Sequence, residues 1–242
     1  MQISNRKYPY IEFKPEREAG NNMLKVENLS KTVDGEKVID NISFTINTGD
    51  KVVILSNNDI AKTTLFQLLA GEIEPDEGKI EWGVTTSQSY FPKDNSKYFE
   101  GVDLSLIDWL RQFSNDQHEE YVRGFLGRML FSGEEATKKA KVLSGGEKVR
   151  CMLSKMMLSN ANVLLLDNPT DHLDLESITS LNKSLERFPG TILFTTHDHE
   201  FIQTIANKII EITPKGILEK EMEYDDYLND ENVQEKLEEM YK

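Results

Sequence analysis

The sequence predicts an α/β fold with a mostly parallel core sheet, an antiparallel β-rich subdomain and an inserted helical subdomain. Three observations predict it. Short apolar runs rich in β-branched residues alternate with stretches of helical periodicity along much of the 242 residues. Two extended runs precede this pattern, and a helical stretch at about 100–143 interrupts it. Strands that alternate with helices form parallel sheets, because each connection must cross over the sheet.

The composition is that of one soluble domain, with 38% hydrophobic and 29% charged residues. The aliphatic run at 163–166 is far shorter than the roughly 20 residues of a membrane helix, and we expect a cytoplasmic protein without membrane insertion. The net charge of −14 argues against broad nonspecific binding to nucleic acid, which depends on basic residues. The single cysteine, Cys151, excludes an internal disulfide.

The first half of the chain opens with an arm and two strands. Residues 1–22 mix basic residues, aromatics and prolines without a clear period, which predicts an arm or the end of a linker. The main domain is expected over 23–220. Alternating residues at 24–29, a turn at Asp34-Gly35 and an extended run at 38–46 predict two strands.

An apolar run at 51–55 predicts a strand, and a loop and a helix to about residue 70 follow it, with Lys62 expected at the helix start. The loop approximates the phosphate-binding pattern G-x-x-x-x-G-K-[ST], whose glycines let backbone N–H groups close on phosphates and whose hydroxyl binds Mg²⁺. Ser56 and Ala61 replace both glycines. The residues expected to contact a nucleotide here are Ser56, Asn58, Asp59, Ala61, Lys62, Thr63 and Thr64.

The second half predicts a helix to about Leu158, a buried strand at 163–166, a helix from about Leu175, and strands at 191–195 and 209–212 with a helix between them. Ser144, Gly145 and Gly146 open the first helix, and a helix N-terminus offers unpaired N–H groups to an anion. Asp167 ends a buried strand and has the oxygen ligands that Mg²⁺ prefers.

Residues 221–242 carry nine acidic and two basic side chains. Apolar residues recur among them at helical spacing, which predicts an acidic amphipathic helix packed on its own domain. The alternative is a partner-binding tail.

Four segments identify a family resemblance by their order: 56–64, Leu143 to Glu147, Leu164 to Asp174, and Thr195 to His199. The chain resembles the nucleotide-binding domain of ATP-binding-cassette proteins from about 23 to 217. The segments PTDHLDLES and RKYPYIEFKPERE resemble the second cassette of the ABC-F subfamily. Its members are cytosolic twin-cassette proteins that act on ribosomes, so residues 1–22 would end an inter-cassette linker. The resemblance implies ATP and Mg²⁺ as cofactors, and a second cassette and the ribosome as partners.

The resemblance also implies residue roles. The signature segment would face the γ-phosphate held by the other cassette, and it comprises Leu143, Ser144, Gly145, Gly146 and Glu147. Asn168 stands at the position of the catalytic glutamate, and His197 matches the switch histidine. Mg²⁺ would involve Thr63, Asp167 and the position that Lys93 occupies. The loop that communicates between cassettes would be Asp171, His172, Leu173 and Asp174.

Several departures from the family pattern predict a weak or inactive nucleotide site. Asp59 brings a negative charge toward a polyphosphate. Val33 replaces the aromatic residue that stacks on adenine, a loss of roughly 1–3 kcal/mol. Lys93 replaces the Mg²⁺-sensing glutamine. Asn168 cannot accept a proton, and loss of a positioned base costs about 10²–10⁴-fold.

Three functions follow as alternatives. The first is an ABC-F-type ATPase half that supplies its signature to a partner cassette, with the isolated chain weak or inactive. The second is the ATP-binding subunit of an ABC transporter. The third is a non-catalytic pseudo-cassette with a regulatory or structural role.

Overall fold

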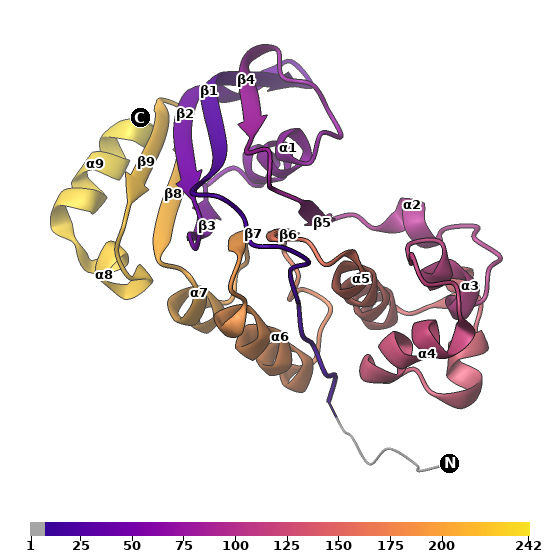
Figure 1. The fold of residues 1–242 in the computed structure, drawn as a ribbon. Coiled ribbons are helices and arrows are strands. Elements are labelled where there is room, and N and C mark those ends of the chain that lie inside the picture. Colours follow the sequence, from indigo (N-terminus) through magenta and orange to yellow (C-terminus); the bar gives the residue numbers. More distant parts are fainter. Residues whose placement is uncertain (1–7) are drawn as a thin grey trace. The chain divides into compact units, whose positions relative to one another are not determined.

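The structure is a computed structural model that describes residues 8–242 (Figure 1). The expected arm at 1–22 therefore lies partly outside the described residues. The described chain divides into two compact units. One unit comprises 15–93, 161–168 and 189–242, and the other comprises 8–14, 94–160 and 169–188. Each is described by itself.

A six-stranded sheet organises the first unit, in the order β5-β6-β7-β3-β8-β9. All neighbouring pairs are parallel except β8 with β9. Its strands are β3 (Lys51–Leu55), β5 (Gln88–Phe91), β6 (Val163–Asp167), β7 (Thr191–Thr195), β8 (Lys208–Thr213) and β9 (Gly216–Lys220). The predicted mostly parallel core sheet is confirmed.

A three-stranded antiparallel sheet of order β2-β1-β4 belongs to the same unit. It consists of β1 (Asn22–Val33), β2 (Glu36–Asn47) and β4 (Glu77–Trp82). Asp34 and Gly35 have φ values of 50° and 82°, as a two-residue hairpin turn requires. Helix α1 (Asp59–Leu69) buries Leu65 and Phe66 in the apolar cluster that these strands share with the core sheet. The predicted antiparallel subdomain is confirmed.

The C-terminal segment of this unit forms two helices, α8 (Tyr224–Asn229) and α9 (Glu231–Tyr241), after α7 (His199–Ile205). This differs from the single helix expected over 221–242. The physical reason is Asp230, which has extended backbone and accepts a hydrogen bond from the Val233 N–H at 3.0 Å, so that a new helix begins there. Val233 and Leu237 are buried, and both helices lie beside β9 in Figure 1.

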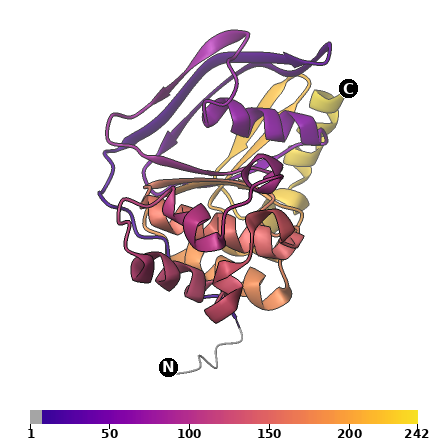
Figure 2. The same ribbon diagram turned by 90° about the vertical axis from the view of Figure 1, so that its right-hand side faces the viewer.

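The second unit is helical. It contains α2 (Ser96–Phe99), α3 (Leu106–Arg111), α4 (Glu119–Arg128), α5 (Gly145–Ser159), α6 (Leu175–Arg187) and 3₁₀ turns at Gly133–Thr137 and Ala140–Val142. Figure 2 brings α2 to α4 to the front. Trp109 stacks on Phe99 with ring centroids 4.9 Å apart, and both are buried. None of the helices within residues 8–242 has the length and apolar character needed to cross a membrane.

Candidate functional site

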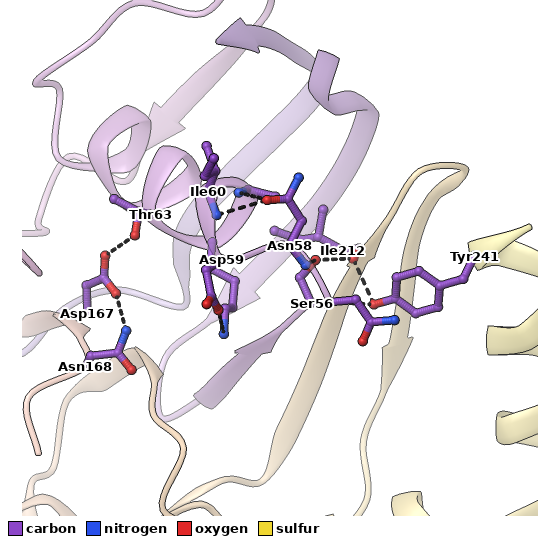
Figure 3. Close-up of polar contacts among 12 residues, drawn as sticks. Ser56, Asn58, Asp59, Ile60, Thr63, Asp167, Asn168, Ile212 and Tyr241 are labelled. Carbon is purple, nitrogen blue, oxygen red and sulfur yellow. Dashed lines mark hydrogen bonds and ion pairs between the residues drawn. The ribbon is translucent and has the colours of Figure 1, made fainter. Parts of the chain in front are cut away.

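The phosphate-loop segment leads directly into helix α1. Helix α1 begins at Asp59, so Lys62 lies in its first turn, at the helix start as expected. Asn58 has extended backbone, and its Oδ1 accepts hydrogen bonds from the Ile60 N–H at 3.0 Å and the Ala61 N–H at 3.4 Å (Figure 3). Asparagine is among the strongest N-cap residues. It therefore takes up two N–H groups that a phosphate-binding loop would offer to an anion.

The Lys62 ammonium already has an anionic partner inside the loop. Its Nζ lies 2.9 Å from Asp59 Oδ1, and the Lys62 side chain is only 7% exposed. The hydrogen bond and charge of Lys62 lower the pKa of Asp59, with smaller contributions from Lys93 and His197. Asp59 is therefore ionised at neutral pH. A nucleotide phosphate would have to displace this carboxylate to reach the Lys62 side chain.

Asp167 is the last residue of β6, is fully buried, and contacts the beginning of α1 through Thr63. Its Oδ2 accepts a hydrogen bond from Thr63 Oγ1 at 2.9 Å, and its Oδ1 accepts one from Asn168 Nδ2 at 3.1 Å. Burial raises the pKa of Asp167, against the opposing effects of the Thr63 hydrogen bond and the Lys93 charge. The expected Mg²⁺ residues Thr63, Asp167 and Lys93 are thus electrostatically coupled.

Two buried oxygens beside Asp167 have no hydrogen-bond partner within the described residues, Asn168 Oδ1 and Thr195 Oγ1. Thr195 pairs with Asp167 in the parallel register of β6 and β7. Asn168 has φ 52°, a left-handed conformation that asparagine tolerates. Buried polar atoms normally have partners. This end of the sheet therefore has unused capacity for a water molecule or a solvated cation.

The loop and His197 share one cavity of 790 Å³. Asp59, Lys62 and His197 line it, together with residues of α8 and α9. Val33 does not line it; it is the last residue of β1 and is half-buried against the apolar cluster of the same unit. The expected residues that the structure brings together are Ser56, Asn58, Asp59, Lys62, Thr63, Asp167, Asn168 and His197. Ala61 and Thr64 are buried in α1.

The signature segment lies in the helical unit as the start of α5. Ser144 Oγ accepts a hydrogen bond from the Glu147 N–H at 3.2 Å, and Glu147 Oε1 accepts one from the Ser144 N–H at 3.1 Å. Glu147 Oε2 also contacts Lys138 Nζ at 3.0 Å. This reciprocal capping box fixes the entry to the helix. Leu143, which precedes it, is buried.

The expected interface loop packs on the signature glycines within the same unit. A Cβ added at Gly146 would lie 3.0 Å from the His172 carbonyl oxygen, and one at Gly145 would lie 3.6 Å from the His172 ring. Asp174 caps α6 by accepting a hydrogen bond from the Ser177 N–H at 2.8 Å. Of the other expected residues, Asp171 is exposed and Leu173 is half-buried. A side chain at 146 would press on the loop backbone at His172, which would have to move by a few tenths of an ångström.

Sequence reasoning missed two residues beside the phosphate loop: Tyr241, which contacts the loop, and Glu211, which contacts Tyr241. Tyr241 Oη accepts a hydrogen bond from the Asn57 N–H at 3.1 Å and donates one to Glu211 Oε2 at 2.6 Å. One signal was available, because Glu211 is an acid inside an otherwise apolar strand. Nothing in the sequence connected Tyr241 with residue 57.

The Asn58 cap gives a first testable prediction. Asn58→Ala is expected to lower the free energy of unfolding by about 1 kcal/mol, because α1 loses the acceptor for two N–H groups. Chemical denaturation monitored by circular dichroism measures this. Asn57→Ala, one residue earlier and exposed, is the matched control and should leave the midpoint unchanged. Equal destabilisation by both variants would contradict the capping role.

Comparison with known proteins places these features in a family context. The model of a family described as "ABC transporter" matches residues 39–171. The chain is 64% identical over 242 residues to the uncharacterized ABC transporter ATP-binding protein YkpA of Bacillus subtilis, covering all of this chain and 45% of that protein. It is 33% identical over 204 residues to the energy-dependent translational throttle protein EttA of Haemophilus influenzae, covering 81% of this chain and 36% of that protein. The chain thus spans less than half the length of these relatives.

Solved structures give the same fold. A putative metal-chelate type ABC transporter in an inward-facing conformation matches with a TM-score of 0.67 and 26% identity, over 84% of each chain. A dimeric ATP-binding cassette bound to ADP and Pi matches with a TM-score of 0.67 over 82% of this chain and 98% of that chain. At 18% identity, this second likeness shows the fold alone.

Proposed function

The chain belongs to the ABC transporter family, and we propose that it is the second cassette of an ABC-F-type ATPase whose own nucleotide site is degenerate. In this proposal its signature segment completes a nucleotide site on the phosphate loop of a partner cassette. The observation that carries the proposal is the contrast between the two motifs. The Lys62 ammonium is paired with Asp59 at 2.9 Å, whereas the signature helix begins with the exposed Ser144 and Gly145 and the half-buried Gly146, and the side chain of its first-turn acid, Glu147, is paired with Lys138.

The degenerate site is supported by its internal contacts. Phosphate binding needs N–H groups and a cation directed at the ligand. Asn58 Oδ1 accepts from two of these N–H groups, and Asp59 occupies the Lys62 cation. Each such contact must break before a polyphosphate can bind. The site is therefore expected to bind ATP weakly, and Asn168 provides no general base for hydrolysis.

The protein residues at this site supply too few ligands to hold Mg²⁺ alone, so the nucleotide phosphates would have to supply the others. Within residues 8–242, no group of three or more His, Cys, Asp or Glu side chains could hold a metal ion. Thr63 Oγ1 and Asp167 Oδ2 provide two oxygen ligands, and the unpartnered Asn168 Oδ1 can accept from a metal-bound water. When bound, Mg²⁺ would neutralise phosphate charge. Asp167 would hold the ion, and Thr63 would turn its hydroxyl oxygen toward it.

The signature segment has the chemistry needed to bind a phosphate presented by another cassette. The N-terminus of a 15-residue helix carries a partial positive charge. Gly145 and Gly146 leave the first two positions of the helix without side chains, and Ser144 presents a hydroxyl at the same end. Glu147, at the third position, is held by the Ser144 N–H and Lys138. These groups would stabilise negative charge on the γ-phosphate as it is transferred to water. His172, packed on both glycines, would transmit the position of the interface loop to the signature.

The ABC-F assignment rests on the segments PTDHLDLES and RKYPYIEFKPERE and on a relative named as a translational throttle protein. We infer the ribosome as a partner and a cytoplasmic location from this likeness. The relatives are more than twice as long as this chain, which leaves room for a first cassette. Residues 1–22 would then end the linker between the cassettes.

Ser144 tests the proposed role of the signature. Combined with a first cassette that has an intact phosphate loop, the chain should stimulate ATP hydrolysis, and Ser144→Ala should reduce that stimulation about 10²-fold or more, as loss of one transition-state donor typically does. Ser105→Ala is the matched control, because Ser105 also caps a helix of the same unit through a 3.2 Å hydrogen bond, from the Asp108 N–H. Equal losses in both variants would show only a capping effect. Stimulation that survives Ser144→Ala would refute the signature role.

Two other functions are each favoured by one observation. The names of the relative from Bacillus subtilis and of the solved transporter favour an ATP-binding subunit of an ABC transporter, which co-purification with a membrane protein would support. The internal pairing of Lys62 favours a non-catalytic pseudo-cassette. Saturable ATP binding measured by titration with and without Mg²⁺ would count against a purely structural role.

A further inference from the structure

A buried acid joins the core sheet to the C-terminal helices. Glu211 lies in β8 and is 8% exposed. Its two carboxylate oxygens accept separate hydrogen bonds, from Tyr227 Oη of α8 at 2.8 Å and from Tyr241 Oη of α9 at 2.6 Å. Burial and the Glu211 carboxylate raise the pKa of both tyrosines, so both hydroxyls keep their protons. These are charge-assisted hydrogen bonds, which are stronger than neutral ones.

Only one of these tyrosines reaches the phosphate loop. Tyr241 Oη accepts a hydrogen bond from the Asn57 N–H at 3.1 Å, across 184 residues of sequence. The same hydroxyl lies 3.2 Å from the Ile212 carbonyl oxygen (Figure 3). Next to it, Ser56 Oγ donates to the Ile212 carbonyl at 2.8 Å and accepts from the Asn58 N–H at 3.1 Å. A hydroxyl that donates to a carboxylate is polarised and becomes a better acceptor. The first half of the loop is therefore attached to β8 and α9.

We propose that Tyr241 is a positioning residue of the nucleotide site, which holds the Asn57 N–H and so keeps the loop in its self-capped arrangement. The inference rests on the proposed function, because it assumes that ATP binds at this loop. Asn58 caps α1 from a backbone position that is held by Tyr241, from outside the loop, and by Ser56, within the loop. Release of the Asn57 N–H allows the loop to reorganise around a polyphosphate. The docking of α9 thereby sets nucleotide affinity.

The test compares Tyr241→Phe with Tyr227→Phe in the otherwise unaltered chain. Both variants remove one hydroxyl partner of Glu211, but only Tyr241→Phe releases the Asn57 N–H. Tyr241→Phe should speed hydrogen exchange at the Asn57 amide and tighten ATP binding about three- to tenfold, the equivalent of one net hydrogen bond. Tyr227→Phe should change neither quantity. Titration with ATP and residue-resolved hydrogen exchange are the two measurements.

The two readouts separate the failure of this inference from that of the proposed function. Unchanged exchange at Asn57 in Tyr241→Phe, or weaker ATP binding in that variant, would overturn the positioning role. Absence of ATP binding in every variant would contradict a nucleotide site at this loop, and the exchange measurement would still decide whether Tyr241 holds Asn57. If Tyr241→Phe does not fold, Glu211→Gln replaces it, because it removes the charge that polarises Tyr241 and keeps the side-chain volume. It should also speed exchange at Asn57.

Discussion

Asp59→Asn is expected to raise the affinity of the chain for ATP about tenfold. The substitution frees the Lys62 ammonium, now 2.9 Å from the carboxylate, and removes a negative charge from the path of the polyphosphate. Asp59 is 57% exposed, so solvent screens both effects, and each is estimated at about 1 kcal/mol or less. Their sum of about 1.4 kcal/mol corresponds to tenfold tighter binding. Isothermal titration calorimetry with Mg-ATP measures the change.

Asp40→Asn is the matched control for this variant. Asp40 pairs with Lys37 at 3.2 Å with the same three-residue spacing, but it lies in β2, away from the phosphate loop. It should leave ATP affinity unchanged. Asp59 also stands in the first turn of α1, where an acid stabilises a helix by about 0.3–1 kcal/mol. The variant should therefore be slightly less stable while binding more tightly, and unchanged affinity would show that Asp59 does not block the site.

Asn168→Glu should raise ATP hydrolysis by about 10²-fold or more when combined with Asp59→Asn, because it restores a general base where only an amide stands. Steady-state phosphate release at saturating ATP measures the rate. The variant removes the Asn168 hydrogen bond to Asp167 at 3.1 Å and adds a second carboxylate beside a buried one. The resulting destabilisation is about 1–3 kcal/mol, and chemical denaturation measures it separately.

Asn168→Gln is the control for side-chain length. It lengthens the side chain as glutamate does, and it imposes the same strain at φ 52°, but it provides no base. An equal gain in rate from Asn168→Gln would show that length, and not proton transfer, limits the reaction. A chain that binds ATP and gains no activity from Asn168→Glu would place the deficit elsewhere, for example at Lys93.

The fold was largely predictable from the sequence. The strands at 51–55 and 191–195 were predicted with the bounds that the structure gives, because a run of about five apolar residues rich in β-branched side chains is too short for most helices and favours a strand. The division of residues 221–242 into α8 and α9 was not predicted. Periodicity continues across Asp230 in the sequence, and only the hydrogen bond from the Val233 N–H reveals that this residue begins a new helix.

The site was predictable in its residues but not in its contacts. Asp59 was expected to repel a nucleotide, and the structure adds that it also occupies the Lys62 ammonium. Lys62 was expected at the start of α1 and lies in its first turn, whereas the role of Asn58 as N-cap was not predicted. Asn168 was recognised as a missing base, whereas its hydrogen bond to Asp167 and its unpartnered Oδ1 depend on side-chain orientation.

The sequence by itself determined the family, the order of the motifs and the residues that depart from the pattern, because these depend on residue type and spacing. Only the tertiary structure decided which polar groups form hydrogen bonds and ion pairs with one another. Residues 57 and 241 are 184 positions apart, and no local periodicity relates them. Folding of α9 against β8 brings the Tyr241 hydroxyl to the phosphate loop, where the buried Glu211 carboxylate fixes it. Such a contact follows from the packing of distant elements and leaves no pattern in the sequence.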